Sequence, residues 1–318
     1  MDQDKLGWFN KINMQYQPVK YWAKLPHPML FAEATSVAVD SEDNVYVFNR
    51  GKNPLIIFDK QGNFLDTWGV GEFTRPHGIK IDKDDNLYLV DDKAHFVQKR
   101  TKKGDLIFQL GDKNNPSDKQ KGYPFNQPTD IAIHPKTGEL FITDGYGNSR
   151  VHRYDSDGKL LLSWGEPGSL PGQFSLPHNI AFFGDDNVVV CDRENCRLQY
   201  FNLNGDFISF KHMHRPIAIT EGLQEYQLIV AEAAPPPVQN GVRNLGLRVE
   251  ILNKEGDRIT RFGSGTLGED FDQFIAPHGI AVDSDGSIYI AEVSYTSVGS
   301  HKLPPREMVS LRKWERVN

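Results

Sequence analysis

Three Pro-His pairs recur along the chain at almost equal intervals. They end in His77, His178 and His278, which lie roughly 100 residues apart, and each is followed by an apolar segment, a turn and a second apolar segment. Equivalent positions of a repeat become symmetry-equivalent positions in space, so the three imidazoles can converge on one point. Zinc is the ion that we expect there, because three protein ligands with an open fourth position form the pattern of a catalytic zinc site.

The repeat that carries these pairs is shorter than the interval between them. Units of roughly 40–60 residues, a length typical of propeller blades, begin near Ala34, Pro76, Pro128, Pro177, Pro216 and Pro277. Each unit reads as four short apolar strands joined by turns rich in Asp, Gly and Asn, which is a hairpin pattern. Six such units predict an all-β fold, a six-bladed β-propeller, and we expect residues 1–318 to form it as a single domain.

A propeller must protect the edge of its last blade. The last unit ends at Val309–Trp314, which reads as its third strand. The alternating segment Val19–Leu25 has no blade of its own and is our candidate for the missing fourth strand. We therefore predict a ring closed by a strand from the N-terminal end.

Alternation is what separates a metal site from a structural repeat feature at the Pro-His pairs. The alternative is a purely structural role, in which the histidines only cap their strands. However, the third and fifth units carry Thr129 and Ile217 at the equivalent position. A purely structural histidine has no reason to alternate, so a metal site is the favoured interpretation.

Further reactive residues follow the second strand of several units. The end of a second strand shares a face with the start of the first, so Arg50, Tyr146 and Arg193 are placed at the same channel mouth as the histidines. The two arginines could bind a carboxylate bidentately; their alternative is an ion pair on the rim. Tyr146 lies between two glycines and could act as a general base near a dication; its alternative is an aromatic plug of the channel mouth.

The composition of the chain limits the kinds of partner that we expect it to bind. The chain has 318 residues and a formal net charge of −6, which argues against a nucleic-acid surface, and it has no apolar run long enough for a membrane span. The first residues lack the apolar segment of a signal peptide. Cys191 and Cys196 would close only a tiny disulfide ring, so we expect free thiols. These features favour a cytoplasmic protein.

Five segments together resemble the peptidyl-α-hydroxyglycine α-amidating lyase family: Phe73–Gly78, Phe125–Asp130, Thr143–Arg150, Leu176–His178 and Asp192–Asn195. The resemblance covers most of the chain and is strongest from Phe73 to Phe201. It implies NHL-type blades, a catalytic zinc ion on the three histidines and Tyr146 as the base. It also implies that Arg50 and Arg193 position the substrate, and we count Asp130 among the substrate-binding residues.

The chain departs from the family pattern at several positions. Gly279 stands where the family has an aspartate linked to a structural calcium ion, so a calcium site is doubtful here, and Ala276 replaces a methionine. The insertion Ala233–Gly241 adds a loop to the face of the site. We expect specificity to reside in loops such as Phe183–Asn187 and Pro235–Asn244.

The leading functional interpretation is a zinc-dependent lyase. Its substrate would be a small α-hydroxylated amide or amine, with a carboxylate, and one product would be a carbonyl compound such as glyoxylate. One alternative is a zinc-dependent hydrolase or hydratase of a small acid or lactone. The other, of a different class, is a non-catalytic NHL propeller that serves as a binding scaffold.

Overall fold

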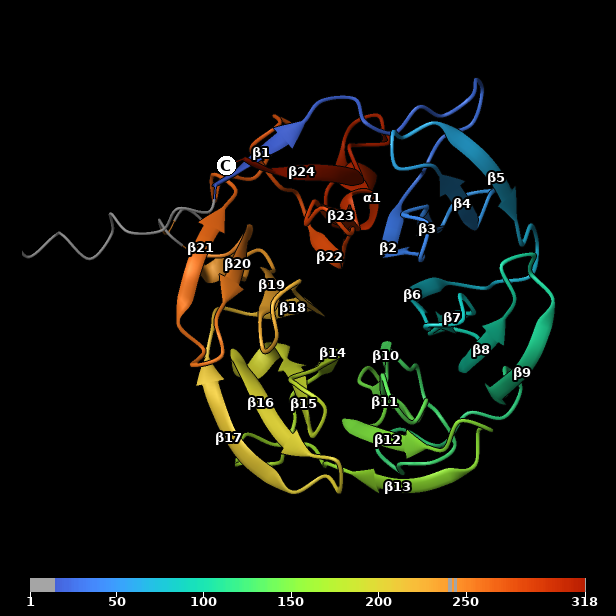
Figure 1. Ribbon diagram of the computed structural model, residues 1–318, viewed down its shortest axis with the longest axis vertical. Helices are drawn as coiled ribbons and strands as arrows, with labels where there is room; N and C mark the ends of the chain where they lie inside the picture. Colours follow the sequence, from blue (N-terminus) through green and yellow to red (C-terminus); the bar gives the residue numbers. More distant parts are fainter. Residues whose placement is uncertain (1–14, 240–241, 243–244, 318) are drawn as a thin grey trace, which may run out of the picture.

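The protein forms six four-stranded antiparallel sheets arranged in one ring (Figure 1). This computed structural model describes residues 15–239, 242 and 245–317. Every strand of the described chain belongs to one of the six sheets, so the predicted six-bladed β-propeller is confirmed. The first strands of the blades begin at or within two residues of the six starts expected from the repeat.

In each of blades 1 to 5 the four strands follow one another from the centre of the ring to its rim. The first three blades are β2 (Ala34–Val39), β3 (Val45–Asn49), β4 (Leu55–Phe58) and β5 (Phe64–Trp68); β6 (Pro76–Ile81), β7 (Leu87–Asp91), β8 (Phe96–Arg100) and β9 (Leu106–Gly111); and β10 (Asp130–Ile133), β11 (Leu140–Asp144), β12 (Arg150–Tyr154) and β13 (Leu160–Trp164).

Blades 4 and 5 repeat this order, and blade 6 combines both ends of the chain. Their strands are β14 (Pro177–Phe182), β15 (Asn187–Asp192), β16 (Arg197–Asn202) and β17 (Phe207–His212); β18 (Pro216–Glu221), β19 (Leu228–Glu232), β20 (Arg248–Leu252) and β21 (Arg258–Phe262); and β22 (Pro277–Val282), β23 (Ile288–Glu292), β24 (Leu311–Val317) and β1 (Gln15–Val19). The helices are short: α1 (Ser294–Ser297) and 3-10 turns at Arg193–Asn195, Pro237–Gln239 and Gly299–His301. None in the described part of the chain is long and apolar enough to cross a membrane.

The hydrophobic core is a set of layers between neighbouring blades. In one layer Tyr88 and Val97 of blade 2 pack against Ile131 and Leu140 of blade 3, and all four side chains are buried. This arrangement follows from the period-2 pattern of the strands, since alternate residues face the blades on either side. The inner strands are thereby held at fixed positions around the central channel.

The ring is closed by a strand from the N-terminal end, but not by the segment we expected. β1 pairs with β24 from Gln15 opposite Val317 to Val19 opposite Lys313. The prediction of a strand over Val19–Leu25 is therefore wrong in its bounds. Pro18 lies within β1, which an edge strand tolerates because its outer N–H groups have no partner.

The apolar residues that suggested a strand after Val19 have another role. Trp22 is buried against the rings of Phe58 in blade 1 and Tyr289 in blade 6, at centroid distances of 5.5 and 5.0 Å. Lys24 makes a single parallel bridge to Asn63. This segment therefore covers the junction at which the ring closes, next to the strand that closes it.

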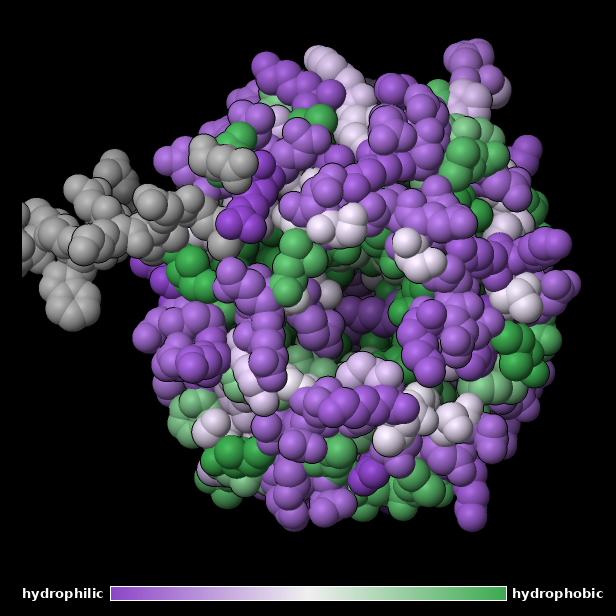
Figure 2. Space-filling model, viewed as in Figure 1, coloured by the Kyte–Doolittle hydropathy of each residue, from purple (hydrophilic) through white to green (hydrophobic). Residues whose placement is uncertain are grey.

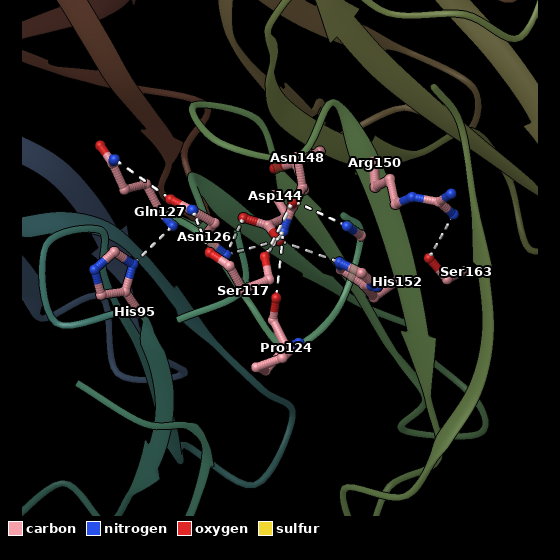
Figure 3. A network of polar contacts seen from close by, with 12 residues as sticks. His95, Ser117, Pro124, Asn126, Gln127, Asp144, Asn148, Arg150, His152 and Ser163 are labelled. Atoms are coloured by element: carbon pink, nitrogen blue, oxygen red, sulfur yellow. Dashed lines mark hydrogen bonds and ion pairs between the residues drawn. The ribbon is translucent and has the colours of Figure 1, made fainter. Parts of the chain in front are cut away.

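A recurring contact holds the channel mouth together. The last residue of a second strand accepts a backbone N–H from the segment that precedes the first strand of its own blade. Figure 3 shows this for blade 3, where the carboxylate of Asp144 accepts the N–H of Asn126 at 3.1 Å and also binds Asn148 and His152. Asp91, Asp192 and Glu292 do the same in blades 2, 4 and 6.

Candidate metal centre and active site

The three histidines lie at irregularities in the innermost strands. Pro76 pairs with Asp91 and Gly78 with Val90, so that His77 has no opposite residue in the ladder. The same shift in register occurs around His178 and His278. Such bulges re-aim a side chain; blades 1 and 5 have the same shift, but only in blades 2, 4 and 6 does it carry a histidine. The innermost strands of these three blades surround the centre of the ring (Figure 1).

Each imidazole is fixed by a hydrogen bond to the following blade. Nδ1 of His77 lies 2.6 Å from the carbonyl oxygen of Thr129, Nδ1 of His178 lies 2.7 Å from that of Ile217, and Nδ1 of His278 lies 2.8 Å from that of Thr35. A carbonyl oxygen can only accept, so each Nδ1 carries the proton. The neutral ring then has its lone pair on Nε2, the tautomer that a metal ligand needs.

The three side chains come together as a ligand set. One ring nitrogen of each histidine lies within 4.8 Å of the other two, and all three residues are buried. The sequence prediction that His77, His178 and His278 converge on one point is therefore borne out by the geometry. Which ion they hold, if any, stays a prediction; the donor set of three imidazoles fits zinc.

Burial and neighbouring arginines keep these rings neutral. Burial, followed by the positive charge of Arg50, lowers the pKa of His278 to about 3. Burial also holds the pKa values of His77 and His178 well below the ordinary value. An unprotonated imidazole is the form that binds a metal ion, so the environment supports the ligand role.

Tyr146 lies directly over the histidines. Its hydroxyl is 3.1 Å from Nε2 of His77 and 3.2 Å from Nε2 of His178. Glycines flank it because the loop runs against other backbone: a Cβ on Gly145 would lie 1.9 Å from the carbonyl oxygen of Pro177. Burial raises the pKa of Tyr146, and the charge of Arg193 is the largest influence that opposes this rise.

A cavity of about 280 Å³ adjoins this cluster. It is bordered by Tyr146, His278, Arg50 and Arg193 and by an apolar wall from blades 5 and 6: Ile217, Ala233, Ala234, Leu267, Ile275, Ala276, Pro277, Val293 and Val298. The sequence-predicted tyrosine and both arginines therefore lie at the same mouth as the metal candidates. The face drawn in Figure 2 is hollowed at the centre of the ring.

The Arg50 side chain is held close to the histidines by two partners. Its Nε donates to the carbonyl oxygen of Pro76 at 3.0 Å, and its Nη1 forms an ion pair with Glu33 at 2.8 Å. Glu33 also accepts a hydrogen bond from the Thr296 hydroxyl. Nη2 of Arg50 is buried without a hydrogen-bond partner among the described residues, which leaves a donor for a ligand.

Two arginines at the cavity were not predicted from the sequence. Arg75 pairs with Asp92 at 2.8 Å, and Arg215 pairs with Glu194, which also binds Arg193. Both precede the proline that opens an inner strand, Pro76 or Pro216. That position could have identified them, because every inner strand starts at the channel mouth and the residue before it must therefore lie there too.

Asp130 is not among the described residues that border this cavity. Its carboxylate is fully buried in the channel, where Oδ2 lies 3.9 Å from Nζ of Lys80 and Oδ1 has no hydrogen-bond partner among the described residues. Burial raises its pKa to about 6. The structure does not bring Asp130 together with Arg50, Tyr146 and Arg193, and its predicted contact with substrate stays untested.

The residues present do not fit the structural calcium ion that the family resemblance implies. Gly279 supplies no carboxylate, and a Cβ at this position would lie 2.5 Å from Cα of Ser36, so an aspartate would need the backbone to move. The cation that reaches into the channel is Lys80 of blade 2, whose Nζ lies 3.5 Å from the carbonyl oxygen of Ile219 in the opposite blade.

No described residue of the two loops expected to control specificity, Phe183–Asn187 and Pro235–Asn244, borders the cavity. Ala233 and Ala234, which directly precede the second loop, do border it; residues 240, 241, 243 and 244 of that loop lie outside the described residues. The segment Phe183–Asn187 contains the turn between β14 and β15, at the opposite end of these strands from His178, so that prediction is wrong. Cys191 and Cys196 are free thiols, as expected.

Family models match two parts of the chain. One described as "6-bladed beta-propeller" matches residues 29–99, and one described as "NHL repeat" matches residues 125–154 and 174–201. The fold also resembles a solved structure titled "Streptogramin B lyase structure", with a TM-score of 0.59 and 16% identity over 92% of this chain and 82% of that one. At this identity the likeness concerns the fold alone.

The chain is similar to proteins with two kinds of name. It is 30% identical to mouse "Peptidyl-glycine alpha-amidating monooxygenase" over 85% of this chain, but it spans only 30% of that protein's length. It is 30% identical to "Peptidyl-alpha-hydroxyglycine alpha-amidating lyase 1" of Drosophila melanogaster, over 94% of this chain and 61% of that protein. It is 32% identical to human "NHL repeat-containing protein 3", over 87% of this chain and 81% of that protein. The chain therefore belongs to the NHL repeat-containing six-bladed β-propeller family, and it is related to proteins named as amidating lyases.

Proposed function

We propose that this protein is a zinc-dependent lyase that cleaves the C–N bond of a small α-hydroxylated amide or amine. The products would be the free amide or amine and a carbonyl compound such as glyoxylate. The observation that carries the proposal is the set of three neutral imidazoles with the Tyr146 hydroxyl 3.1 and 3.2 Å from two of their nitrogens. The lyase-named relatives support it.

His77, His178 and His278 would hold the zinc ion through Nε2. A bound zinc ion acts as a Lewis acid, which makes a substrate hydroxyl more acidic. The three Nδ1–H groups keep the imidazoles in place through the carbonyl oxygens of Thr129, Ile217 and Thr35. These partners lie in, or directly before, the innermost strands of the neighbouring blades.

Tyr146 would accept the proton of the substrate hydroxyl. The electron pair left on oxygen forms the carbonyl, the C–N bond breaks, and the phenol returns the proton to the leaving nitrogen. The base requires a phenol with a lowered pKa, whereas burial raises it. The positive charges that face this group, Arg193 and Arg50 from the chain and the dication of the filled site, act in the required direction.

Arg50 and Arg193 would bind the substrate through a carboxylate. Nη2 of Arg50 is buried and has no hydrogen-bond partner among the described residues, and of the Arg193 guanidinium only Nε is paired, with Glu194 at 2.7 Å. A carboxylate between such donors would be held in a fixed orientation, which positions the carbon next to it for C–N cleavage.

The test uses α-hydroxyhippurate and related α-hydroxyglycine derivatives with the zinc-loaded protein, and measures glyoxylate. We expect glyoxylate from the unaltered protein and none from His178→Ala treated in the same way. If no such compound yields glyoxylate while a lactone or an enoate is turned over with zinc present, the hydrolase or hydratase alternative replaces the lyase. Absence of bound metal together with absence of any turnover would favour the non-catalytic scaffold.

A further inference from the structure

The cavity next to the histidines has more arginine donors than one carboxylate requires. Four arginines border it, namely Arg50, Arg75, Arg193 and Arg215, and no acidic side chain is among its described lining residues. The carboxylates that pair with these arginines belong to Glu33, Asp92 and Glu194, which are not lining residues, and they leave one of the four positive charges without a counterion. The proposed chemistry accounts for Arg50 and Arg193 and leaves Arg75 and Arg215 without a role.

The four arginines come from opposite sides of the ring. Arg50 and Arg75 belong to the neighbouring blades 1 and 2, whereas Arg193 and Arg215 belong to the neighbouring blades 4 and 5. In a ring of six blades, blade 1 faces blade 4 and blade 2 faces blade 5 (Figure 1). The cavity therefore has one arginine pair on each of two facing sides, with Tyr146 and His278 also at its wall.

In neither pair are all the positive charges and hydrogen-bond donors matched by partners among the described residues. Arg193 and Arg215 share a single carboxylate, that of Glu194, so this pair has an excess positive charge. On the other side Nη2 of Arg50 is buried without a hydrogen-bond partner among the described residues, and Arg75 uses only Nη1, with Asp92. Buried donors without partners are costly, and a ligand with an anionic group at each end would satisfy both sides.

We infer that the substrate carries two carboxylates and that each arginine pair binds one of them, so that Arg50 and Arg193 bind different carboxylates instead of sharing one. If the proposed lyase function holds, the substrate class is an N-acyl-α-hydroxyglycine whose acyl part ends in a second carboxylate. A cavity of about 280 Å³ lies at the small end of ligand sites, which fits a short dicarboxylate. The apolar part of the wall, from blades 5 and 6, would cover the methylene groups between the two charges.

The experiment compares two unreactive ligands of matched length, N-succinylglycine and N-butyrylglycine, by calorimetric titration of the zinc-loaded protein at low salt. They differ only in the second carboxylate. A hydrogen bond to a charged group contributes enough for roughly a 10-fold or larger difference in affinity. We expect the succinyl compound to bind at least that much more tightly, and this preference to shrink as salt is added.

The variant R75M/R215M sharpens the comparison. We expect its preference for the succinyl compound to be smaller than that of the unaltered protein, because the second carboxylate keeps only one of its two arginines. The control is R258M, since Arg258 lies at the start of β21 and pairs with Glu250 outside the cavity; it retains the preference. Melting curves verify that the variants are folded, and the comparison on the unaltered protein does not depend on them.

Equal affinity for the two ligands in the unaltered protein, or binding of neither, overturns the inference. Neither compound has the hydroxyl that the lyase reaction needs, so the result is independent of the glyoxylate assay. A succinyl preference without glyoxylate from any α-hydroxyglycine would support the second carboxylate and refute the lyase. Glyoxylate with no succinyl preference would do the reverse.

Discussion

Blades 2, 4 and 6 differ from blades 1, 3 and 5 at one position of the innermost strand. In the first set this position is His77, His178 or His278, whose imidazoles gather in one cluster, where Nε2 of His77 and Nε2 of His178 face the Tyr146 hydroxyl. In the second set it is Thr35, Thr129 or Ile217, and the group used is the backbone carbonyl oxygen, which accepts the Nδ1–H of the preceding blade. One half of the repeat supplies the candidate metal ligands and the other half orients them.

This division explains why the histidines alternate. A histidine in every blade would place six imidazoles around one axis. Alternation leaves three, and each finds an oxygen in the next blade that fixes its tautomer. The side chain at the orienting position is free to vary, because the carbonyl belongs to the backbone; threonine occupies it twice and isoleucine once.

The largest effect is expected for His178→Ala, which removes one of the three clustered histidines. We expect bound zinc to fall from about one ion per chain to nearly none, because two remaining ligands hold the ion weakly at neutral pH, and we expect glyoxylate formation to stop. Metal analysis of the purified variant checks this. The control is His212→Ala, since His212 is exposed on β17; it retains the metal. Full retention of zinc in His178→Ala would contradict the ligand set.

The second change tests the residue that lies over the ligands. We expect Tyr146→Phe to lower kcat by about 10²–10⁴-fold, the usual effect of losing a general base, while zinc stays bound. Tyr123→Phe is the control, because Tyr123 is an exposed residue outside the cavity. Loss of zinc in parallel with activity would mean that Tyr146 supports the metal site and does not act on the proton.

The third change tests the junction between the ligand-bearing blade 6 and the orienting blade 1. Trp22 is 7% exposed and packs on a ring from each of these blades. We expect Trp22→Ala to reduce the free energy of unfolding by about 3–5 kcal/mol. Tyr21→Ala is its neighbour and control, since Tyr21 is 83% exposed. Equal urea midpoints for the two variants would show that this segment does not hold the ring closed.

The smallest effect concerns Asp130 of blade 3, the residue that follows Thr129. Its pKa is raised to about 6 from the ordinary 3.8 by burial, so ionisation in the folded state costs stability. The penalty is absent below about pH 4 and complete above about pH 6. Asp130→Asn removes it, so we expect the variant to gain on the order of 3 kcal/mol relative to the unaltered protein between pH 4 and pH 7.

Unfolding in urea at the two pH values measures this gain. Because each comparison is made at one pH, the titration of other groups cancels to first order. A difference between variant and unaltered protein that does not change with pH would show that Asp130 is already ionised at pH 4 in the folded state.

The repeat made the fold and the histidine cluster predictable. Strand periodicity and turn residues recur six times, so errors in one unit are corrected by the others, and equivalent positions must meet in a closed ring. The strand that closes the ring was predicted at the wrong residues, because a segment that occurs only once cannot be checked against other copies of the repeat. Pro18 weakened the strand signal of Gln15–Val19, while Trp22 gave a stronger apolar signal in a segment that covers a junction.

Individual side-chain contacts and orientations were not predictable. Topology predicts that Asp192 and Arg193 lie at the same mouth. It does not predict that the Asp192 carboxylate accepts the Ser175 N–H while the Arg193 guanidinium borders the cavity. Nor does the sequence show that Arg75 and Arg215 come to face one another across the ring. Such contacts depend on rotamers chosen in the packed structure.

The central claim is that three histidines of alternate blades hold one catalytic zinc ion. Anomalous diffraction at the zinc absorption edge, on crystals of the unaltered protein, tests it most directly. We expect one strong zinc peak per chain on the channel axis, within bonding distance of Nε2 of His77, His178 and His278. No peak at this place after growth with zinc, or a peak bound by other residues alone, would contradict it.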